Sequence, residues 1–318
     1  MSDAKPVETD ALDPDIRRFV TALNEAYGRF PNFDKLPLAE RRAAAEVVRA
    51  PWRAGGPTMW CSIELDVAGL RGRIHVPREA SALPALLYLH GGGWTMFSID
   101  THDRLMREYA ARAGVIVVGI DYSLSPEAKY PVALNEVIAA VEWLRRDGAA
   151  HGIDGTRLAL GGDSAGANLA MAAALTLLPR PGPALRGLLL NYGVFTPEPS
   201  ASYALYDGPR YMLTIDEMRY FWNNYIREPA DLRDPRVAPY LADVRGLPPA
   251  LFSVAACDIL ADSNRAMAAK LNAAGVPADV HVYAGASHSF LEAMSIAPLS
   301  NRALDVAAGW LNHRLMNG

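Results

Sequence analysis

The apolar positions of the chain change their spacing near residue 59. Between residues 16 and 30 they recur every three or four positions, as on one face of a helix, and residues 37–50 continue with a second helical pattern. Short apolar runs typical of strands then take over. The expected strands in this part are residues 59–67, 70–76, 84–94 and 114–122. The last two runs are continuous enough for buried strands of a parallel sheet.

Helical and strand patterns then alternate to the end of the chain. The expected helices are residues 133–146, 164–178, 262–275 and about 300–315, and the expected strands are residues 156–162, 185–195, 248–258 and 278–285. This alternation predicts an α/β fold, with a mostly parallel central sheet and helices on both faces.

The alternation breaks at residues 196–246, a stretch too long for an ordinary loop. Within it Thr214 and Glu217 have the spacing of a capping box and predict a helix at 214–226. We expect this segment to pack over the carboxyl edge of the sheet beside the amino-terminal helices. The predicted organisation is 1–50 as amino-terminal cap helices, 51–195 and 247–318 as the core, and 196–246 as a cap insertion.

Composition excludes several classes of protein. The 318 residues are 51% hydrophobic, enough for a large core, and 31 basic against 35 acidic side chains give a net charge of −4. That charge does not favour nucleic acid. Cys61 and Cys257 lack metal-site spacing, and we expect two reduced thiols. The first 15 residues lack a leader pattern and no apolar run reaches the roughly 18 residues of a membrane span, so we expect a soluble, cytoplasmic protein.

The letters GDSAG at residues 162–166 stand between a predicted strand and a predicted helix. In that context G-x-S-x-G predicts a nucleophile elbow, because a tight turn with glycines at both ends lifts the serine hydroxyl clear of the backbone. Ser164 is then the nucleophile. The plainer alternative is a glycine-rich turn with a serine that caps the helix.

A serine nucleophile needs a base and an orienting acid later in the chain. His288 lies in a small-residue loop just after a predicted strand, and we predict that it is the base. Asp258 ends the preceding strand and is predicted to orient the imidazole. Asp262, four residues further on, is expected to cap the following helix instead.

The letters HGGGW at residues 90–94 end another predicted strand. Successive glycines let backbone N–H groups approach a ligand closely. We expect two of Gly91, Gly92 and Gly93, with the amide of Ala165, to hold the oxyanion of a tetrahedral intermediate. Which two glycines act stays open.

Other residues near these motifs have less specific signals. The aromatic candidates for substrate contact are Trp94, Tyr206, Tyr211 and Phe221, although an ordinary cap core explains them equally well. We expect Asp163 to make a scaffold hydrogen bond and Glu127 to hold its loop as a structural carboxylate.

Taken together, these motifs resemble the bacterial hormone-sensitive-lipase-like carboxylesterases (family IV) of the α/β-hydrolase fold. The matching letters are HGGGW, DYSLSPEAKYP, GDSAGANLA, LPPA, DILAD and HSF. The resemblance implies a helical cap, ester hydrolysis, a short acyl pocket and a homodimer through residues of about 278–318. The chain departs from the family pattern at Ser123, Ser125, Ala167, Ile259 and Ser289.

The sequence therefore predicts a serine carboxylester hydrolase that acts on a small-molecule ester and needs neither metal nor cofactor. Two alternatives stay open. One is an amidase or aryl-formamidase with the same triad, because the leaving group is not readable from sequence. The other is a non-catalytic small-molecule receptor, which the presence of all three triad residues disfavours.

Overall fold

A computed structural model describes residues 11–316. The first ten residues, part of the segment without a leader pattern, and the last two lie outside this range. The strands are β1 (Cys61–Val67), β2 (Leu70–Val76), β3 (Leu83–Leu89), β4 (Ile116–Ile120), β5 (Ile153–Asp163), β6 (Gly187–Asn191), β7 (Ala250–Cys257) and β8 (Ala278–Ser287). They form one sheet in the order β1-β2-β4-β3-β5-β6-β7-β8. Strand β2 pairs antiparallel with its two neighbours, β1 and β4, and the other strand pairs within residues 11–316 are parallel. The predicted α/β sheet is confirmed.

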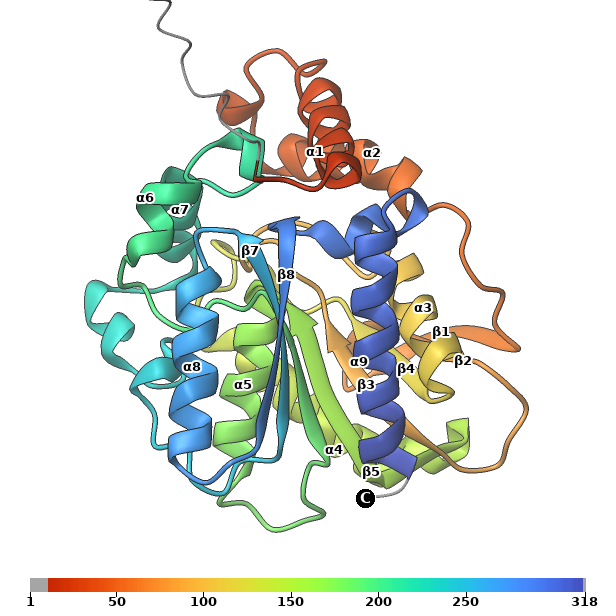
Figure 1. The fold of residues 1–318 in the computed structure, drawn as a ribbon. Helices are drawn as coiled ribbons and strands as arrows, with labels where there is room; N and C mark the ends of the chain where they lie inside the picture. The colour runs from red at the N-terminus through yellow and green to blue at the C-terminus, as the bar shows by residue number, and fades with distance from the viewer. Residues whose placement is uncertain (1–10, 317–318) are drawn as a thin grey trace, which may run out of the picture.

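Helices cover both faces of the sheet (Figure 1). They are α1 (Pro14–Tyr27), α2 (Leu38–Arg53), α3 (Asp103–Ala113), α4 (Val132–Asp147), α5 (Ala165–Leu177), α6 (Ala201–Tyr206), α7 (Ile215–Tyr225), α8 (Ala261–Ala273) and α9 (Pro298–Met316). One apolar core lies under α4, α5 and α8, and a second lies under α3 and α9. Strands β3 and β4 are buried along their whole length because both cores press on them.

Helix α3 is absent from the elements expected from sequence. Three of its eleven residues are arginines, which dilute the apolar pattern. Its buried side chains are Leu105, Met106, Glu108, Tyr109, Ala110 and Ala113. The helix ends at Gly114, whose φ of 68° is the left-handed conformation that commonly closes a helix. The sequence signals for α3 are the apolar pairs Leu105/Tyr109 and Met106/Ala110, four residues apart, followed by Gly114.

The amino-terminal helices and the first half of the insertion lie at the carboxyl ends of the strands. Figure 1 shows α1 and α2 above that edge, with α6 and α7 beside them. The capping box of α7 is confirmed, since the Glu217 amide donates to Thr214 Oγ1 at 3.1 Å and the Thr214 amide donates to Glu217 Oε2 at 2.9 Å.

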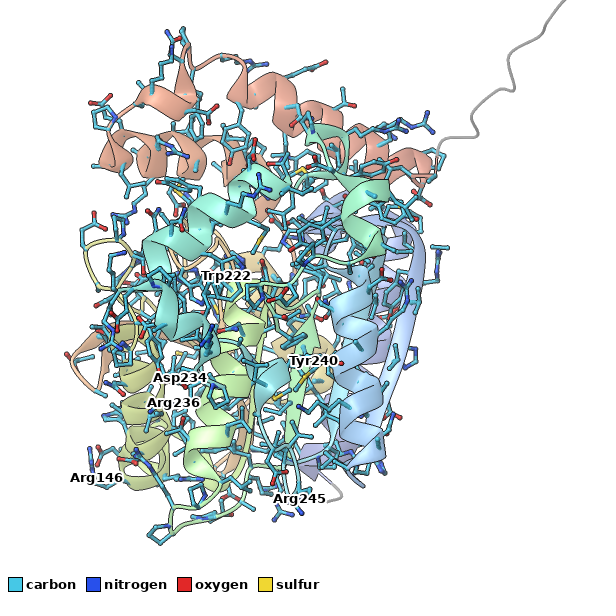
Figure 2. The ribbon with its side chains drawn as sticks, turned by 90° about the vertical axis from the view of Figure 1, so that its left-hand side faces the viewer. Arg146, Trp222, Asp234, Arg236, Tyr240 and Arg245 are labelled. Atoms are coloured by element: carbon cyan, nitrogen blue, oxygen red, sulfur yellow. The ribbon has the colours of Figure 1, made fainter. Side chains whose placement is uncertain are left out.

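The second half of the insertion leaves this edge and runs along α5. Figure 2 shows Trp222, Tyr240 and Arg245 spread along this side of the molecule. Val237 and Val244 are buried in the core of α5, which explains the path. Asn168 of α5 fixes it, because its Nδ2 donates to the carbonyl oxygens of Val194 at 2.8 Å and Val237 at 2.9 Å.

Replacement of Asn168 by alanine removes the side-chain amide that donates to the buried carbonyl groups of Val194 and Val237. We expect Asn168→Ala to lower the free energy of unfolding by about 2–4 kcal/mol, because an unsatisfied buried polar group costs about 1–3 kcal/mol. Chemical denaturation measures the change. Asn223→Ala, at an exposed position of α7, is the control and should have almost no effect. Equal stability of the two variants would contradict the role of Asn168 in fixing the path of the insertion.

Candidate active site

The turn between β5 and α5 places Ser164 in a strained conformation, with φ of 53° and ψ of −116°. The neighbouring glycines explain how this turn fits the fold. A Cβ on Gly166 would lie 1.9 Å from the carbonyl oxygen of Leu89, and one on Gly162 would lie 2.4 Å from the same atom. The end of β3 therefore packs directly on the backbone of the turn, and only glycine fits there.

The structure brings the three side chains of the predicted triad together. Ser164 Oγ lies 3.0 Å from His288 Nε2, and His288 Nδ1 lies 2.7 Å from Asp258 Oδ2. The amide of Leu260 donates to the other Asp258 oxygen at 2.9 Å. All three side chains are buried. With the proton on Nδ1, the imidazole donates to Asp258 and accepts from the Ser164 hydroxyl, as a general base must.

Electrostatics favour a charged His288. Burial alone would lower the pKa of His288, but the charge and hydrogen bond of Asp258 outweigh it, and Asp163 and Glu217 add smaller effects. The pKa of His288 is therefore raised above its ordinary value. An imidazolium formed during proton transfer is stabilised in this setting.

Asp262 is not the cap of helix α8, contrary to the expectation from sequence. The helix begins at Ala261 and Leu260 occupies the cap position. Asp262 Oδ2 instead accepts the amide of Ser202 at 2.9 Å, which ties α6 to the start of α8. Asp258, which directly follows β7, is the carboxylate that contacts His288.

Backbone hydrogen bonds orient the glycine loop after β3. The carbonyl of Gly91 lies 2.8 Å from His90 Nδ1, and the carbonyl of Gly92 accepts from the amides of Thr95 at 3.0 Å and Met96 at 2.9 Å. N–H and C=O point in opposite directions across a trans peptide, so these bonds fix the directions of the Gly92 and Gly93 amides. The Gly91 amide is already a donor to Asp163 Oδ1 at 3.1 Å. This occupied donor leaves Gly92 and Gly93 as the glycine candidates.

The remaining candidate donor is the amide of Ala165. Ala165 is the first residue of α5, where amides have no partner within the helix. A negative charge beside this helix terminus is also stabilised by the helix dipole.

Asp163 forms a buried polar group beneath the elbow. It accepts from the Tyr88 hydroxyl at 2.9 Å and lies 3.3 Å from His102 Nε2. Burial would raise the pKa of Asp163, but the charge of His102 outweighs it and the pKa is lowered. The expected scaffold role of Asp163 is confirmed. His90, in contrast, has its pKa lowered to about 3 by burial and by His102, and it is neutral.

A cavity of about 460 Å³ opens at Ser164 and His288. Of the four predicted substrate contacts, only Phe221 lies in its wall. Trp94 is fully buried and stacks on Tyr225, with ring centroids 4.2 Å apart. Tyr206 and Tyr211 pack edge to face on each other at 5.3 Å, away from the cavity wall. These three aromatic residues belong to the packing of the cap side, which corrects the expectation.

The cavity wall contains residues that the sequence analysis missed. From the amino-terminal segment come Asn24, Tyr27, Asp34, Arg41 and Arg49, and from the insertion Pro209, Met212, Leu213, Thr214 and Glu217. Arg49 pairs with Glu292, and this charge outweighs the effect of burial, so the pKa of Arg49 is raised. No local motif marks these residues. Glu127 forms an ion pair with Arg42, in keeping with its expected structural role.

Between residues 11 and 316, none of the helices combines the length and the apolar character that a membrane span needs. The same residues contain no group of three or more histidine, cysteine, aspartate or glutamate side chains that could hold a metal ion.

Comparisons with known proteins agree with this architecture. Residues 86–292 match the family model described as the alpha/beta hydrolase fold. An acetyl esterase of Salmonella paratyphi A is 32% identical over 271 residues, which are 83% of each chain. The hyperthermophilic esterase of the archaeon Pyrobaculum calidifontis is 30% identical, with a TM-score of 0.87 over 95% of this chain and 98% of that one. A thermostable esterase of Pseudomonas putida is 31% identical, with a TM-score of 0.86 over 98% and 99%.

The chain belongs to the alpha/beta hydrolase fold family. Within it, the chain is a carboxylesterase of the hormone-sensitive-lipase-like group.

The close contact of Gly166 with Leu89 predicts a position that tolerates no side chain. We expect Gly166→Ala to lower the free energy of unfolding by more than about 3 kcal/mol, because overpacking against backbone cannot relax through a rotamer change. Thermal unfolding measures the effect. Gly309→Ala is the control: a Cβ there meets nothing within 4 Å, and alanine should add up to about 1 kcal/mol in a helix. A stable, fully folded Gly166→Ala protein would refute this account of the turn.

Proposed function

We propose that the protein is a serine carboxylester hydrolase for small, short-acyl esters, which acts through Ser164, His288 and Asp258 by an acyl-enzyme. The observation that carries the proposal is the pair of short contacts, 3.0 Å and 2.7 Å, that joins these three side chains at the wall of a cavity. The same group of residues contains a nucleophile, a base and an orienting acid.

In the first half-reaction, Ser164 Oγ attacks the ester carbonyl carbon and its proton passes to His288 Nε2. The carbonyl oxygen gains the negative charge, which the amides of Gly92, Gly93 and Ala165 stabilise by hydrogen bonds. When the C–O bond to the alcohol breaks, His288 returns the proton to the leaving oxygen. The products are the free alcohol and an acyl-serine.

In the second half-reaction, His288 takes a proton from water and the resulting hydroxide attacks the acyl-serine carbonyl. The oxyanion forms again at the same amides, and collapse releases the carboxylic acid as Ser164 regains its proton from His288. Asp258 keeps the imidazole in one orientation throughout and stabilises its charged form.

The preference for short acyl chains rests on the shape of the site and on its relatives. The ring of Phe221 covers Gly93 so closely that a Cβ on this glycine would lie 2.2 Å from it. An acyl group held at Gly93 would therefore contact the Phe221 ring directly, which limits its length. The Salmonella relatives are named acetyl esterases, which agrees with a small acyl site.

A homodimer through residues 278–318 and a cytoplasmic location remain predictions from sequence. In support of the former, β8 is the last strand of the sheet, and its Val280 and Val282 are 40% and 48% exposed.

Hydrolysis of a graded ester series tests the proposal. We expect wild type to turn over p-nitrophenyl acetate and butyrate faster than the octanoate and dodecanoate, and Ser164→Ala to lose at least about 10⁴-fold in kcat, as removal of a catalytic nucleophile does. p-Nitroacetanilide serves as the amide control. Cleavage of the anilide with inertness toward every ester would replace the esterase by an amidase, and activity retained in Ser164→Ala would remove the proposed nucleophile.

The pH dependence of kcat/KM tests His288 as the base. Only the neutral imidazole accepts the serine proton, and the pKa of His288 is raised because Asp258, Asp163 and Glu217 favour its charged form. Activity should therefore fall as the pH decreases through a midpoint above the ordinary histidine value of about 6.5, by tenfold per unit below it. Rates read at the isosbestic wavelength of nitrophenol and nitrophenolate measure this acidic part of the pH profile. A flat profile down to about pH 4 contradicts a histidine base.

A further inference from the structure

Thr95, just after the glycine loop, holds two carbonyl groups of that loop. Its amide donates to the carbonyl of Gly92 at 3.0 Å, and its hydroxyl donates to the carbonyl of Gly93 at 3.0 Å. The side chain is fully buried. The first bond orients the Gly92–Gly93 peptide, which carries the Gly93 amide. The second bond orients the Gly93–Trp94 peptide.

Arg42 of helix α2 in turn holds Thr95. Its Nε donates to the carbonyl of Thr95 at 2.8 Å, and Nη2 donates to the carbonyl of Ser125 at 2.9 Å. The amide of Ser125 donates to the carbonyl of Trp94 at 2.8 Å, so the guanidinium holds the segment after the glycines directly at Thr95 and indirectly through Ser125. Its outer edge pairs with Glu127, a carboxylate that is 60% exposed.

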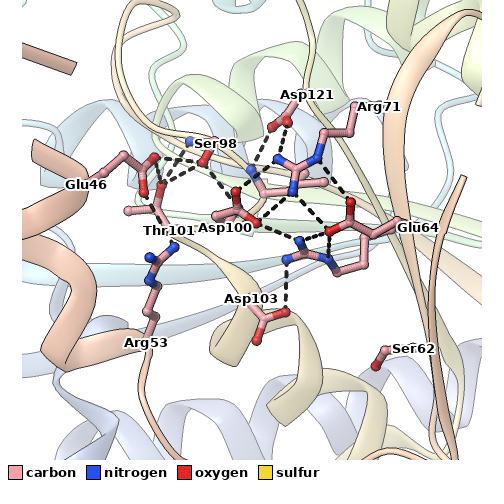
Figure 3. Close-up of polar contacts among 12 residues, drawn as sticks. Glu46, Arg53, Ser62, Glu64, Arg71, Ser98, Asp100, Thr101, Asp103 and Asp121 are labelled. Carbon is pink, nitrogen blue, oxygen red and sulfur yellow. Dashed lines mark hydrogen bonds and ion pairs between the residues drawn. The ribbon is translucent and has the colours of Figure 1, made fainter. Parts of the chain in front are cut away.

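The same face of α2 reaches two other loops around the site. Glu46, one turn after Arg42, accepts from the hydroxyls of Ser98 at 2.7 Å and Thr101 at 2.9 Å. Figure 3 shows this pair of contacts beside the ion-pair network that joins the same loop to the sheet. Arg49, three residues further on, pairs with Glu292 in the segment that follows His288. Spacings of four and three residues place all three side chains on one side of a helix.

We infer that Arg42 and Thr95 are positioning residues for ester hydrolysis, through which helix α2 fixes residues 92–95 and with them the direction of the Gly93 amide that receives the oxyanion. The inference rests on the proposed function. It gives helix α2 a part in the chemical step, in addition to its contribution to the cavity wall.

Two features of Arg42 make it suited to this task. A guanidinium has five N–H donors in a rigid plane, so one side chain serves two carbonyl groups and one carboxylate in fixed geometry. Its contacts with Thr95 and Ser125 are partly buried, where a charge-assisted hydrogen bond is stronger than in water. Lysine has a single nitrogen and cannot reproduce this planar arrangement.

The test measures turnover and the affinity for a transition-state analogue in the same set of variants. The analogue is an alkyl trifluoromethyl ketone, which forms a hemiketal with serine and places an oxyanion at the donors. We expect Arg42→Gln and Thr95→Val to lower kcat on p-nitrophenyl acetate by about 10- to 100-fold, a part of the 10²–10³-fold loss that follows removal of a donor. KM should stay within about twofold, and ketone affinity should fall by the same factor as kcat.

The control variants separate positioning from general loss of structure. Thr95→Ser keeps the hydroxyl and should restore kcat, and Arg42→Lys should lie between wild type and Arg42→Gln. Glu127→Gln weakens only the exposed ion pair, which contributes about 0–1 kcal/mol, and should leave kcat within about twofold. Thermal unfolding of each variant establishes that it is folded at the assay temperature.

The outcomes distinguish this inference from the proposed function. An inert wild type overturns the proposed function and this inference with it. An active wild type with unchanged kcat in Arg42→Gln and Thr95→Val overturns the inference alone. A fall in kcat without a matching fall in ketone affinity, or one that Thr95→Ser does not restore, also contradicts it.

Discussion

The contact between the end of β3 and the backbone at the start of α5 is the constraint on which the site depends. With the Leu89 carbonyl against Gly162 and Gly166, neither residue has room for a side chain. This contact brings the glycine loop, which continues from β3, next to the serine that precedes α5. The proposed nucleophile and its two proposed glycine donors thus come from segments more than seventy residues apart, yet their spacing is set by one backbone-to-backbone approach.

Two neighbouring residues at this turn have opposite tasks because their side chains leave the backbone on different sides. Ser164 faces the cavity and His288, whereas Asp163 bonds to Tyr88, His102 and the Gly91 amide. A buried carboxylate with several donors is both satisfied and immobile. The hydrogen bonds of Asp163 to Tyr88 and to the Gly91 amide connect the backbone of the strained turn to β3 and the glycine loop.

The sequence was informative where local chemistry dictates local structure. G-x-S-x-G between a strand and a helix, the capping box of α7 and the strand-end positions of Asp258 and His288 all depend on neighbours in the chain. Helix α3 escaped because its three arginines dilute the apolar pattern, although each of them forms an ion pair within the helix, with Asp103 or Glu108 four residues away. Trp94, Tyr206 and Tyr211 were misplaced because an aromatic residue in a core and one in a pocket have the same sequence pattern.

Much of the cavity wall comes from two segments, residues 24–49 and residues 209–221, and neither contributes a strand to the sheet. Over generations, selection can therefore alter the wall and retune which molecules enter, while the strand-borne serine and histidine keep their places. The two faces of α2 differ in how freely their residues can change. On α2, the face with Arg42, Glu46 and Arg49 is anchored to loops of the core, so inherited variation should accumulate on the opposite face, where Val47 is 63% exposed.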